Sequence, residues 1–327
     1  MKNKKYQLAL IGYMLITVGL IVYFFGLVIS IPRNIFFFGD QQLHMINSFI
    51  VLYSGIGVQF GIILLILDIY ILLPKIKKDN KIRLNTIDKP TCTVALMAYN
   101  EEDSIYSAVQ DFNNHEKVKR VIVINNNSSD NTKLEAERAG AIVIDEKNQG
   151  YGYCFVRALL EASSYEDTSI SVLCEGDMSF RAYDLDKMYA YIKHTDIVNG
   201  TRTVDRLQDG SSQLTAFINY GNIYAGKLLE MKYFGSCNLT DVGTTFKMCR
   251  NDALLEIIAL LNPEKINHEM NPYFMDTALS KGYDIIECPI TFHKRIGYSK
   301  GGNASSYEAF KLGIRMIWGI SFGWWDR

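Results

Sequence analysis

The chain has 327 residues, with 34 Lys and Arg against 35 Asp and Glu, so its formal net charge at pH 7 is −1. This balance leaves no general basic field and argues against nucleic acid as a partner. A chain of this length can form one large catalytic domain and a smaller part. The six cysteines form no CxxC pair and no zinc-spaced cluster with His, so we expect them to be reduced and mostly buried.

Two long apolar segments come first in the chain. Residues 6–31 contain no charged side chain, and residues 48–73 contain only Asp68. Each is long enough to cross a hydrocarbon layer of about 30 Å as a helix. A cleaved signal peptide is disfavoured, because the first segment exceeds the usual apolar core of such peptides and no small-residue cleavage site follows it. We therefore expect a transmembrane hairpin.

Small residues on these two segments indicate how the helices pack. They are Gly12, Gly19, Gly26, Gly57 and Gly61. Such residues allow two helices to approach closely, within one hairpin or between subunits, so a homo-oligomer stays possible. Lysines precede the first segment and follow the second, whereas the connector carries only Arg33. By the positive-inside rule we expect a cell-membrane protein whose two ends and catalytic domain are cytoplasmic.

From residue 91 predicted strands alternate with predicted helices. The strands cover residues 91–97, 121–124, 141–144, 170–174, 196–200 and 284–290. The helices cover residues 104–112, 132–139, 153–162, 183–194 and 213–231. This alternation predicts an α/β fold with a mostly parallel sheet covered by helices on both faces.

The strand at 170–174 is followed directly by Glu175, Gly176 and Asp177. Ligands of open α/β sheets bind at the carboxyl ends of strands. Two carboxylates separated by one glycine can face the same pocket, and such hard oxygen ligands suit Mg²⁺ or Mn²⁺ bridging a nucleoside diphosphate. The alternative is a solvated turn, in which these residue types are common.

The last segment, residues 307–325, combines Lys311 and Arg315 with many large apolar side chains. It is too polar to span a membrane comfortably. We expect an interfacial helix anchored by Trp318, Trp324 and Trp325.

The polar turns, taken in order, resemble the motifs of glycosyltransferase family 2, and within it those of the dolichyl- or polyprenyl-phosphate sugar synthases. The matching stretches, over roughly residues 91–321, are residues 98–102 (P-x-Y-N-E in the family), 125–132 (D-D-G-S-T-D-G-T), 150–152 (G-K-G), 175–177 (D-x-D), 200–202 (G-S-R), 241–246 (D-x-G-x-G-F) and 295–300 (R-x-G-x-S-K). The resemblance implies an inverting enzyme of the GT-A type, with a Rossmann-like sheet, that uses a UDP- or GDP-sugar.

The resemblance also assigns residues to the donor and to a divalent metal. The donor-binding residues it implies are Ala98, Tyr99, Asn100, Glu101, Asn125, Asn126, Gly150, Gly152 and Gly176. The metal-binding residues are Glu175 and Asp177, with Glu175 in the place of an aspartate. Asn125 and Asn126 replace the aspartates that contact base and ribose in the family, so neutral amides have to make those hydrogen bonds and the donor base stays open.

The resemblance implies catalytic roles for five residues. Asp177 holds a metal that stabilises the departing diphosphate, and Arg202 is a candidate second clamp on phosphate oxygens. A lipid phosphate is already an anion, so Arg295 and Lys300 need only neutralise and position it. A sugar hydroxyl instead requires a base, for which Asp241 is the candidate. Without the resemblance, Arg295 and Lys300 are equally typical of headgroup anchors, and Asp241 of a turn or helix cap.

These observations predict three parts: a transmembrane hairpin with a basic linker at residues 1–90, a cytoplasmic GT-A domain at 91–300 and an interfacial amphipathic helix at 301–327. The leading hypothesis is a membrane-anchored, metal-dependent hexosyltransferase that acts on polyprenyl phosphate. One alternative is transfer to a hydroxyl of a lipid-linked glycan. Another is a non-catalytic membrane-tethered binding protein, which the substituted aspartates at Asn125, Asn126 and Glu175 motivate.

Overall fold

The computed structural model describes residues 7–37, 39–71, 82–87, 89–210, 215–233, 236–297 and 306–324. The chain separates into two compact units. Of the described residues, the helical unit contains those between 7 and 71 and residues 230–233, and the α/β unit contains those between 82 and 229 and between 236 and 324.

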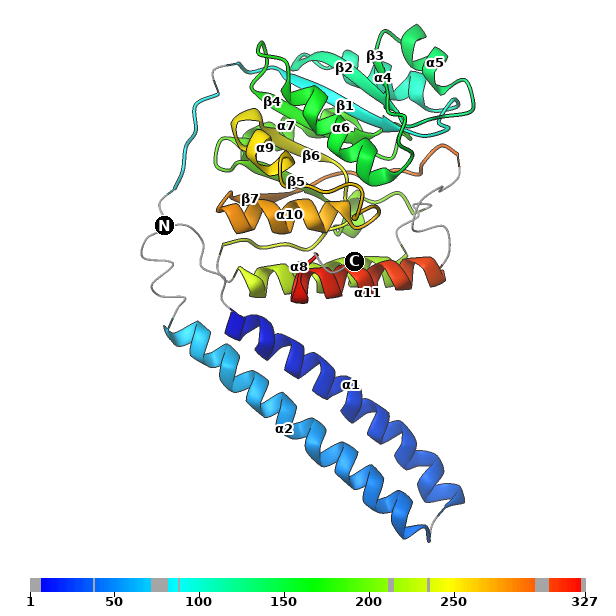
Figure 1. Ribbon diagram of the computed structural model, residues 1–327, viewed down its shortest axis with the longest axis vertical. Helices are drawn as coiled ribbons and strands as arrows, with labels where there is room; N and C mark the ends of the chain where they lie inside the picture. The colour runs from blue at the N-terminus through cyan, green and yellow to red at the C-terminus, as the bar shows by residue number, and fades with distance from the viewer. Residues whose placement is uncertain are drawn as a thin grey trace. The chain divides into compact units, whose positions relative to one another are not determined.

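The helical unit is a hairpin of α1 (Gln7–Phe36) and α2 (Gln41–Ile71), which run side by side (Figure 1). A Cβ atom on Gly12 would lie 2.7 Å from the carbonyl oxygen of Gly61, so these two glycines allow the close approach that was predicted. Gly57 is not part of this contact, because its nearest neighbouring atom would be 3.9 Å away. In both helices only 11% of the most apolar stretch is buried, which is unlike the core helix of a soluble protein.

The α/β unit is organised around a seven-stranded sheet with the order β3-β2-β1-β4-β6-β5-β7 (Figure 1). The strands are β1 (Cys92–Ala98), β2 (Val118–Asn125), β3 (Ile142–Asp145), β4 (Ile170–Glu175), β5 (Ile197–Thr201), β6 (Lys247–Arg250) and β7 (Ile285–Pro289). All neighbouring pairs are parallel except the two that β6 makes with β4 and β5. The predicted α/β fold with a mostly parallel sheet is confirmed, and the antiparallel strand β6 was missed.

Helices cover both faces of the sheet. They are α4 (Ile105–Asn113), α5 (Thr132–Arg138), α6 (Tyr151–Ser163), α7 (Leu185–Ile192), α9 (Asn251–Ile258) and α10 (Met270–Lys281). Two further helices, α8 (Ala216–Lys232) and α11 (Ser306–Phe322), lie beyond α10 (Figure 1). The sequence did not predict α9 and α10. The other helices lie where they were predicted, with ends shifted by a few residues.

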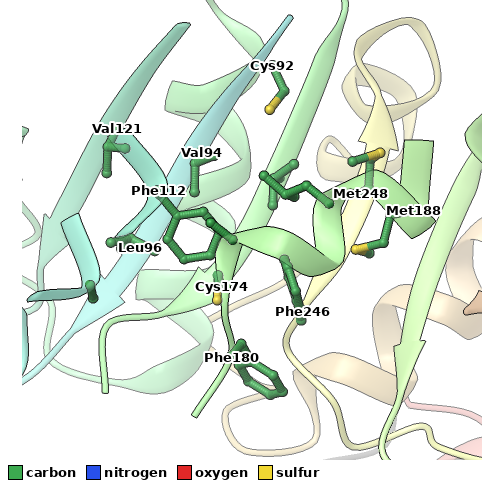
Figure 2. Close-up of a cluster of buried hydrophobic side chains, with 14 of the residues drawn as sticks. Cys92, Val94, Leu96, Phe112, Val121, Cys174, Phe180, Met188, Phe246 and Met248 are labelled. Atoms are coloured by element: carbon green, nitrogen blue, oxygen red, sulfur yellow. The ribbon is translucent and has the colours of Figure 1, made fainter. Parts of the chain in front are cut away.

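Alternate side chains of β1 enter two different apolar cores. Leu96 belongs to the core beneath α4 and α7, where Phe112 meets Phe246 edge-on with ring centroids 6.1 Å apart (Figure 2). On the other face, Phe155 of α6 packs against Phe274 of α10 at 5.6 Å. Because both faces of the sheet are apolar, polar side chains gather at the strand ends.

The helix α11 is attached to α10. The indole nitrogen of Trp324 donates a hydrogen bond to Asp276 Oδ2 at 2.7 Å, and its ring lies 5.4 Å from that of Tyr273. Trp324 is therefore buried within the protein, and its prediction as a membrane anchor was wrong. Trp318 is 54% exposed, as an interfacial side chain requires, and Trp325 lies outside the described residues.

Candidate active site

A cavity of about 800 Å³ opens where β1 and β4 end. The sequence-predicted residues that line it are Ala98, Tyr99, Glu101, Asn126, Gly150, Glu175, Gly176, Asp177, Arg202 and Arg295. Those that do not line it are Asn100, Asn125, Gly152 and Asp241, and Lys300 lies outside the described residues. The parallel strands thus bring together residues that are far apart in the sequence.

The turn after β1 is fixed to the turn after β2. Asn100 has a left-handed backbone, with φ of 52°, and its Oδ1 accepts a hydrogen bond from the backbone N–H of Ser129 at 2.8 Å. The N–H of Glu101 donates to Thr132 Oγ1 at 2.7 Å. Asn100 therefore shapes the cavity wall from behind, while Glu101 faces the cavity.

Asn125, the last residue of β2, and Asn126, which follows it, make hydrogen bonds within the protein. Asn125 Nδ2 donates to Asp145 Oδ1 at 2.9 Å. Asn126 Nδ2 donates to the carbonyl of Asn148 at 2.8 Å, and its Oδ1 accepts from the N–H of Gly150 at 2.9 Å. Asn126 thereby holds the turn that precedes α6 against the cavity.

Asp177 lies at the floor of the site and is 1% exposed. Its Oδ1 accepts a hydrogen bond from the N–H of Ser179 at 2.9 Å, and its Oδ2 lies 2.7 Å from Nη2 of Arg295. The same Nη2 is 3.5 Å from an oxygen of Glu101. Arg295, from the loop after β7, therefore balances two carboxylates from the turns that follow β1 and β4.

Glu175, the last residue of β4, also faces the cavity. Burial, together with the nearby negative charge of Asp177, raises the pKa of Glu175 to about 7. Its Oε1 accepts a hydrogen bond from Thr245 Oγ1 at 2.7 Å. The side chain is therefore held in place on one side.

Glu175 and Asp177 can supply two ligands to a divalent cation whose other ligands are water and substrate phosphates. Among the described residues no group of three or more His, Cys, Asp or Glu side chains is arranged to hold a metal. Magnesium-type sites commonly use one or two carboxylates with substrate phosphates and water. Among the described residues the buried Oδ2 of Asp177 is contacted only by the guanidinium of Arg295, which balances its charge, so it is a suitable hard ligand.

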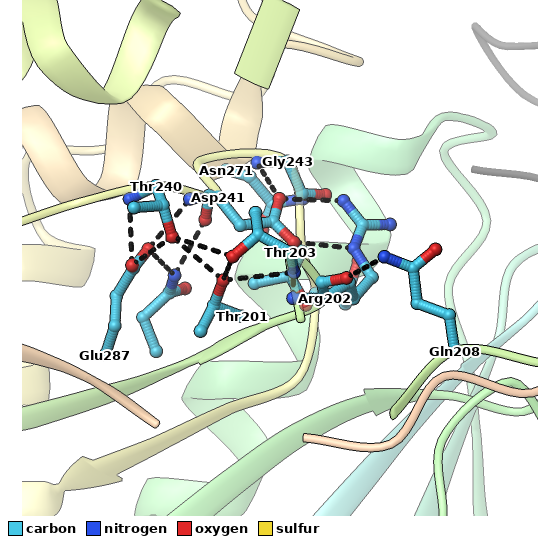
Figure 3. Close-up of polar contacts among 12 residues, drawn as sticks. Thr201, Arg202, Thr203, Gln208, Thr240, Asp241, Gly243, Asn271 and Glu287 are labelled. Atoms are coloured by element: carbon cyan, nitrogen blue, oxygen red, sulfur yellow. Dashed lines mark hydrogen bonds and ion pairs between the residues drawn. The ribbon is translucent and has the colours of Figure 1, made fainter. Parts of the chain in front are cut away.

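Arg202 and Asp241, predicted for separate roles, form a bidentate ion pair (Figure 3). Nε and Nη2 of Arg202 lie 2.7 and 2.8 Å from the two oxygens of Asp241, which is 1% exposed. Burial alone would raise the pKa of Asp241, but the charge and hydrogen bonds of Arg202 outweigh it and hold the pKa below its ordinary value. Glu287 of β7 accepts hydrogen bonds from the N–H groups of Thr240 and Asp241, both at 2.8 Å, and so fixes this loop.

Sequence reasoning missed a set of cavity residues that come from α6, α10 and the loop before β6. Tyr151, Thr245 and Asn271 line the cavity beside Glu175, and no motif indicated the last of them. Another part of the lining is apolar and comes from α8 and α11, which lie side by side (Figure 1). Phe217 of α8 and Phe310 of α11 have ring centroids 6.4 Å apart there. The amphipathic pattern of the last helix was the available signal for this wall.

Comparison with known proteins finds a matching family profile and several similar sequences. The sequence profile described as Glycosyl transferase family 2 matches residues 93–258. A dolichyl-phosphate hexose transferase of Haloferax volcanii is 26% identical over 208 residues, which cover 63% of this chain and 85% of that protein. An uncharacterized protein of Methanocaldococcus jannaschii is 25% identical over 246 residues, which cover 74% of this chain and 96% of that protein.

A solved structure has a similar fold. Glucosyl-3-phosphoglycerate synthase from Mycobacterium tuberculosis, in complex with Mn²⁺, UDP and glucosyl-3-phosphoglycerate, matches with a TM-score of 0.52 and 15% identity. The match covers 72% of this chain and 81% of that one. At this identity the likeness establishes the fold alone.

Proposed function

This chain belongs to glycosyltransferase family 2 and has the GT-A fold, and from that premise we propose that it transfers a hexose from a UDP- or GDP-sugar to polyprenyl phosphate, with inversion at the anomeric carbon. Polyprenyl phosphate is an amphiphile, with an anionic head and a long apolar chain. The similarity to a dolichyl-phosphate hexose transferase supports an acceptor of this class.

The observation that carries the proposal is the two-part lining of the cavity. Glu175, Asp177 and Arg295 give one part the charges that a diphosphate, its cation and an acceptor phosphate need. Ile314 and Ile317 of α11 belong to the apolar part, which suits a hydrocarbon chain. A water-soluble acceptor has no apolar chain to bind against this part of the cavity lining.

We assign the divalent cation, Mg²⁺ or Mn²⁺, to Asp177 and Glu175. Bound there, it supplies Lewis-acid stabilisation of the charge that develops on the departing diphosphate. The Mn²⁺ and UDP in the mycobacterial structure are consistent with this chemistry. The ion pair of Arg202 uses Nε and Nη2, which leaves Nη1 to reach a phosphate oxygen.

The acceptor phosphate needs positioning more than activation. Its second pKa is near 6, so at neutral pH it is already a nucleophilic anion. An oxygen of the phosphate forms the new bond to the anomeric carbon while the bond to the diphosphate breaks, and the diphosphate leaves with the electron pair. Arg295 offsets the repulsion between the incoming phosphate and the carboxylates of Asp177 and Glu101.

The pairing of Asp241 weighs against transfer to a glycan hydroxyl. That reaction needs a general base, and the charge of Arg202 holds the pKa of Asp241 low. The scaffold alternative requires a degenerate site, whereas the described carboxylates and arginines are ordered around one cavity. Both alternatives remain outcomes of the test below.

The first test is transfer of radiolabelled sugar from a panel of UDP- and GDP-sugars to polyprenyl phosphate in membranes. We expect a mild-acid-labile labelled lipid from the wild type with added metal, and a loss of at least about a hundredfold for Asp177→Asn, because an electrostatic contact to the developing charge is removed. The matched control, Asp186→Asn, changes a carboxylate that is 61% exposed and should keep full activity. If the folded wild type labels no lipid from any donor, the proposed acceptor is wrong. If Asp177→Asn keeps the transfer activity of the wild type, the proposed metal site is wrong.

We also propose that the hairpin spans the membrane and that the α/β unit is cytoplasmic. Both helices are long and apolar enough to cross. The lysines at residues 75–81, on which this orientation depends, lie outside the described residues. Protease added outside sealed right-side-out vesicles should leave the α/β unit intact, and its digestion there would contradict this topology.

A further inference from the structure

A chain of hydrogen bonds runs from α10 to the Glu175 carboxylate. Asn271 Nδ2 donates to the hydroxyl of Tyr151 at 2.7 Å, and that hydroxyl lies 2.7 Å from Thr245 Oγ1. Thr245 Oγ1 donates to Glu175 Oε1, also at 2.7 Å. Four elements of the fold contribute one residue each: α10, the first turn of α6, the loop before β6 and the end of β4.

The direction of donation along this chain is fixed at both ends. The amide nitrogen of Asn271 also faces the carbonyl of Gly243 at 3.3 Å, so the amide is oriented with its donors toward Tyr151. At the other end Thr245 Oγ1 donates to Glu175 Oε1, and the carboxylate of Glu175 can only accept when it is deprotonated to bind a cation. Thr245 has one hydroxyl hydrogen and gives it to Glu175, so Tyr151 has to donate to Thr245.

Burial makes this arrangement energetically significant. Thr245 is 2% exposed and Asn271 is 4% exposed. In such a site each donor polarises the next, and an unpaired hydroxyl is costly. The bond to Glu175 is charge-assisted, which makes it the strongest of the three.

The residue types also depart together from the motifs quoted above. Tyr151 stands in the place of the lysine of G-K-G, Thr245 in that of the second glycine of D-x-G-x-G-F, and Glu175 in that of the first aspartate of D-x-D. These three departures are in direct contact. A glutamate has one more rotatable bond than an aspartate, and the hydroxyl chain restrains that extra freedom.

We propose that Tyr151, Thr245 and Asn271 are positioning residues that hold Glu175 by Oε1 and leave Oε2 for the divalent cation of the donor complex. The inference rests on the proposed metal-dependent transfer. It accounts for how a longer carboxylate serves in a site whose usual residue is shorter. None of the three residues needs to touch the cation.

The test measures Mn²⁺ affinity, by electron paramagnetic resonance of free Mn²⁺, on the full chain in detergent with UDP or GDP present. Removing the hydroxyl in Thr245→Val should weaken Mn²⁺ binding by at least about tenfold, the lower end of the range for a hydrogen bond to a charged group. Thr245→Ser should restore it. Tyr151→Phe should weaken it by about threefold, and Tyr153→Phe, on the same helix without a described hydroxyl contact, should not change it.

A double-mutant cycle separates positioning from general support of the fold. In a Glu175→Gln background the effect of Thr245→Val on Mn²⁺ affinity should disappear, because the charged partner is gone. Equal effects in both backgrounds would overturn the inference, as would wild-type affinity in Thr245→Val. If Thr245→Val does not fold, the same double-mutant cycle with Glu175→Gln is measured for Tyr151→Phe. Wild-type affinity in Asp177→Asn would instead overturn the proposed metal site itself.

Discussion

Lys247 is a fully buried lysine in the middle of the sheet. Its exposed fraction is 0%, and its Nζ donates to Asn199 Oδ1 at 2.9 Å and to the carbonyl of Thr244. Burial lowers the pKa of Lys247 from 10.5 to about 7, against the opposing charges of Asp241 and Glu287. Folding therefore releases a proton from this side chain at alkaline pH.

This release predicts a pH dependence of stability. Between pH 7 and 10.5 the unfolded state holds the proton and the native state does not, so raising the pH stabilises the native state, by at most about 1.4 kcal/mol per pH unit. Lys247→Met removes the titrating group. We expect the melting temperature of the wild type, in detergent, to rise relative to Lys247→Met between pH 7 and 9. Parallel pH profiles for the two proteins would show that Lys247 keeps an ordinary pKa.

At the residue scale, the sequence predicted the carboxylates and arginines of the site but not their partners. Asp177, Arg202 and Arg295 carry charges after strand ends, and the topology alone brings such positions together. The hydrogen-bond partners within the site, such as Asn271, were not predicted, because Asn271 lies in α10 and no sequence motif covers that helix. Asp241 and Arg202 were placed by motif, yet their mutual pairing depends on loop geometry that no local pattern encodes.

At the element scale, the close contact at the start of α6 depends on Gly152. A Cβ atom there would lie 2.3 Å from the carbonyl oxygen of Ile266, so the helix could not approach that segment with any side chain. Gly152 does not line the cavity. It acts on the site by allowing Tyr151 and Gly150 to reach it.

We expect Gly152→Ala to destabilise the fold by about 1–3 kcal/mol, because the backbone of residue 266 has to move. Gly221→Ala is the matched control, since a Cβ atom there has nothing within 4 Å and Ala favours a helix interior by up to about 1 kcal/mol. Melting temperatures in detergent should fall for the first variant and hold or rise for the second. Equal shifts would show that the contact is not tight.

The elements that the sequence missed share a physical reason. β6 is four residues long and has Lys247 and Arg250 at its ends, so it is typical of a surface loop until its neighbours bury it. α10 is buried around most of its circumference, including Asn271 and Asp276, and therefore shows no apolar stripe. The alternating strands and amphipathic helices around them were predictable because each has one apolar face.

At the scale of the whole molecule, α8 and α11 expose a group of large apolar side chains. The group comprises Phe217, Tyr220, Tyr307, Phe310, Ile314, Trp318 and Phe322. Exposed apolar patches of this kind mark surfaces that meet a membrane or a partner. Since the same helices supply the apolar part of the cavity wall, we expect this surface to contact lipid.

Tryptophan fluorescence can test this expectation on the full chain in nanodiscs. With Trp325 replaced by Phe, brominated lipid should quench Trp318, which is 54% exposed, and should leave Trp324 unquenched, because Trp324 is 7% exposed and is bonded to Asp276. Variants that keep one tryptophan, Trp318→Phe and Trp324→Phe, separate the two signals. Equal quenching of both would contradict a lipid contact specific to this surface.

The late position of β6 in the chain has a consequence for synthesis. The β3-β2-β1-β4 half of the sheet is complete in the nascent chain at residue 175, whereas both strand partners of β5 come after it. Until residues 247–250 leave the ribosome, β4 presents an open edge of unpaired backbone groups. Closure of the sheet is a late, long-range step. A chain truncated before residue 250 keeps that edge and is a candidate for aggregation and proteolytic removal.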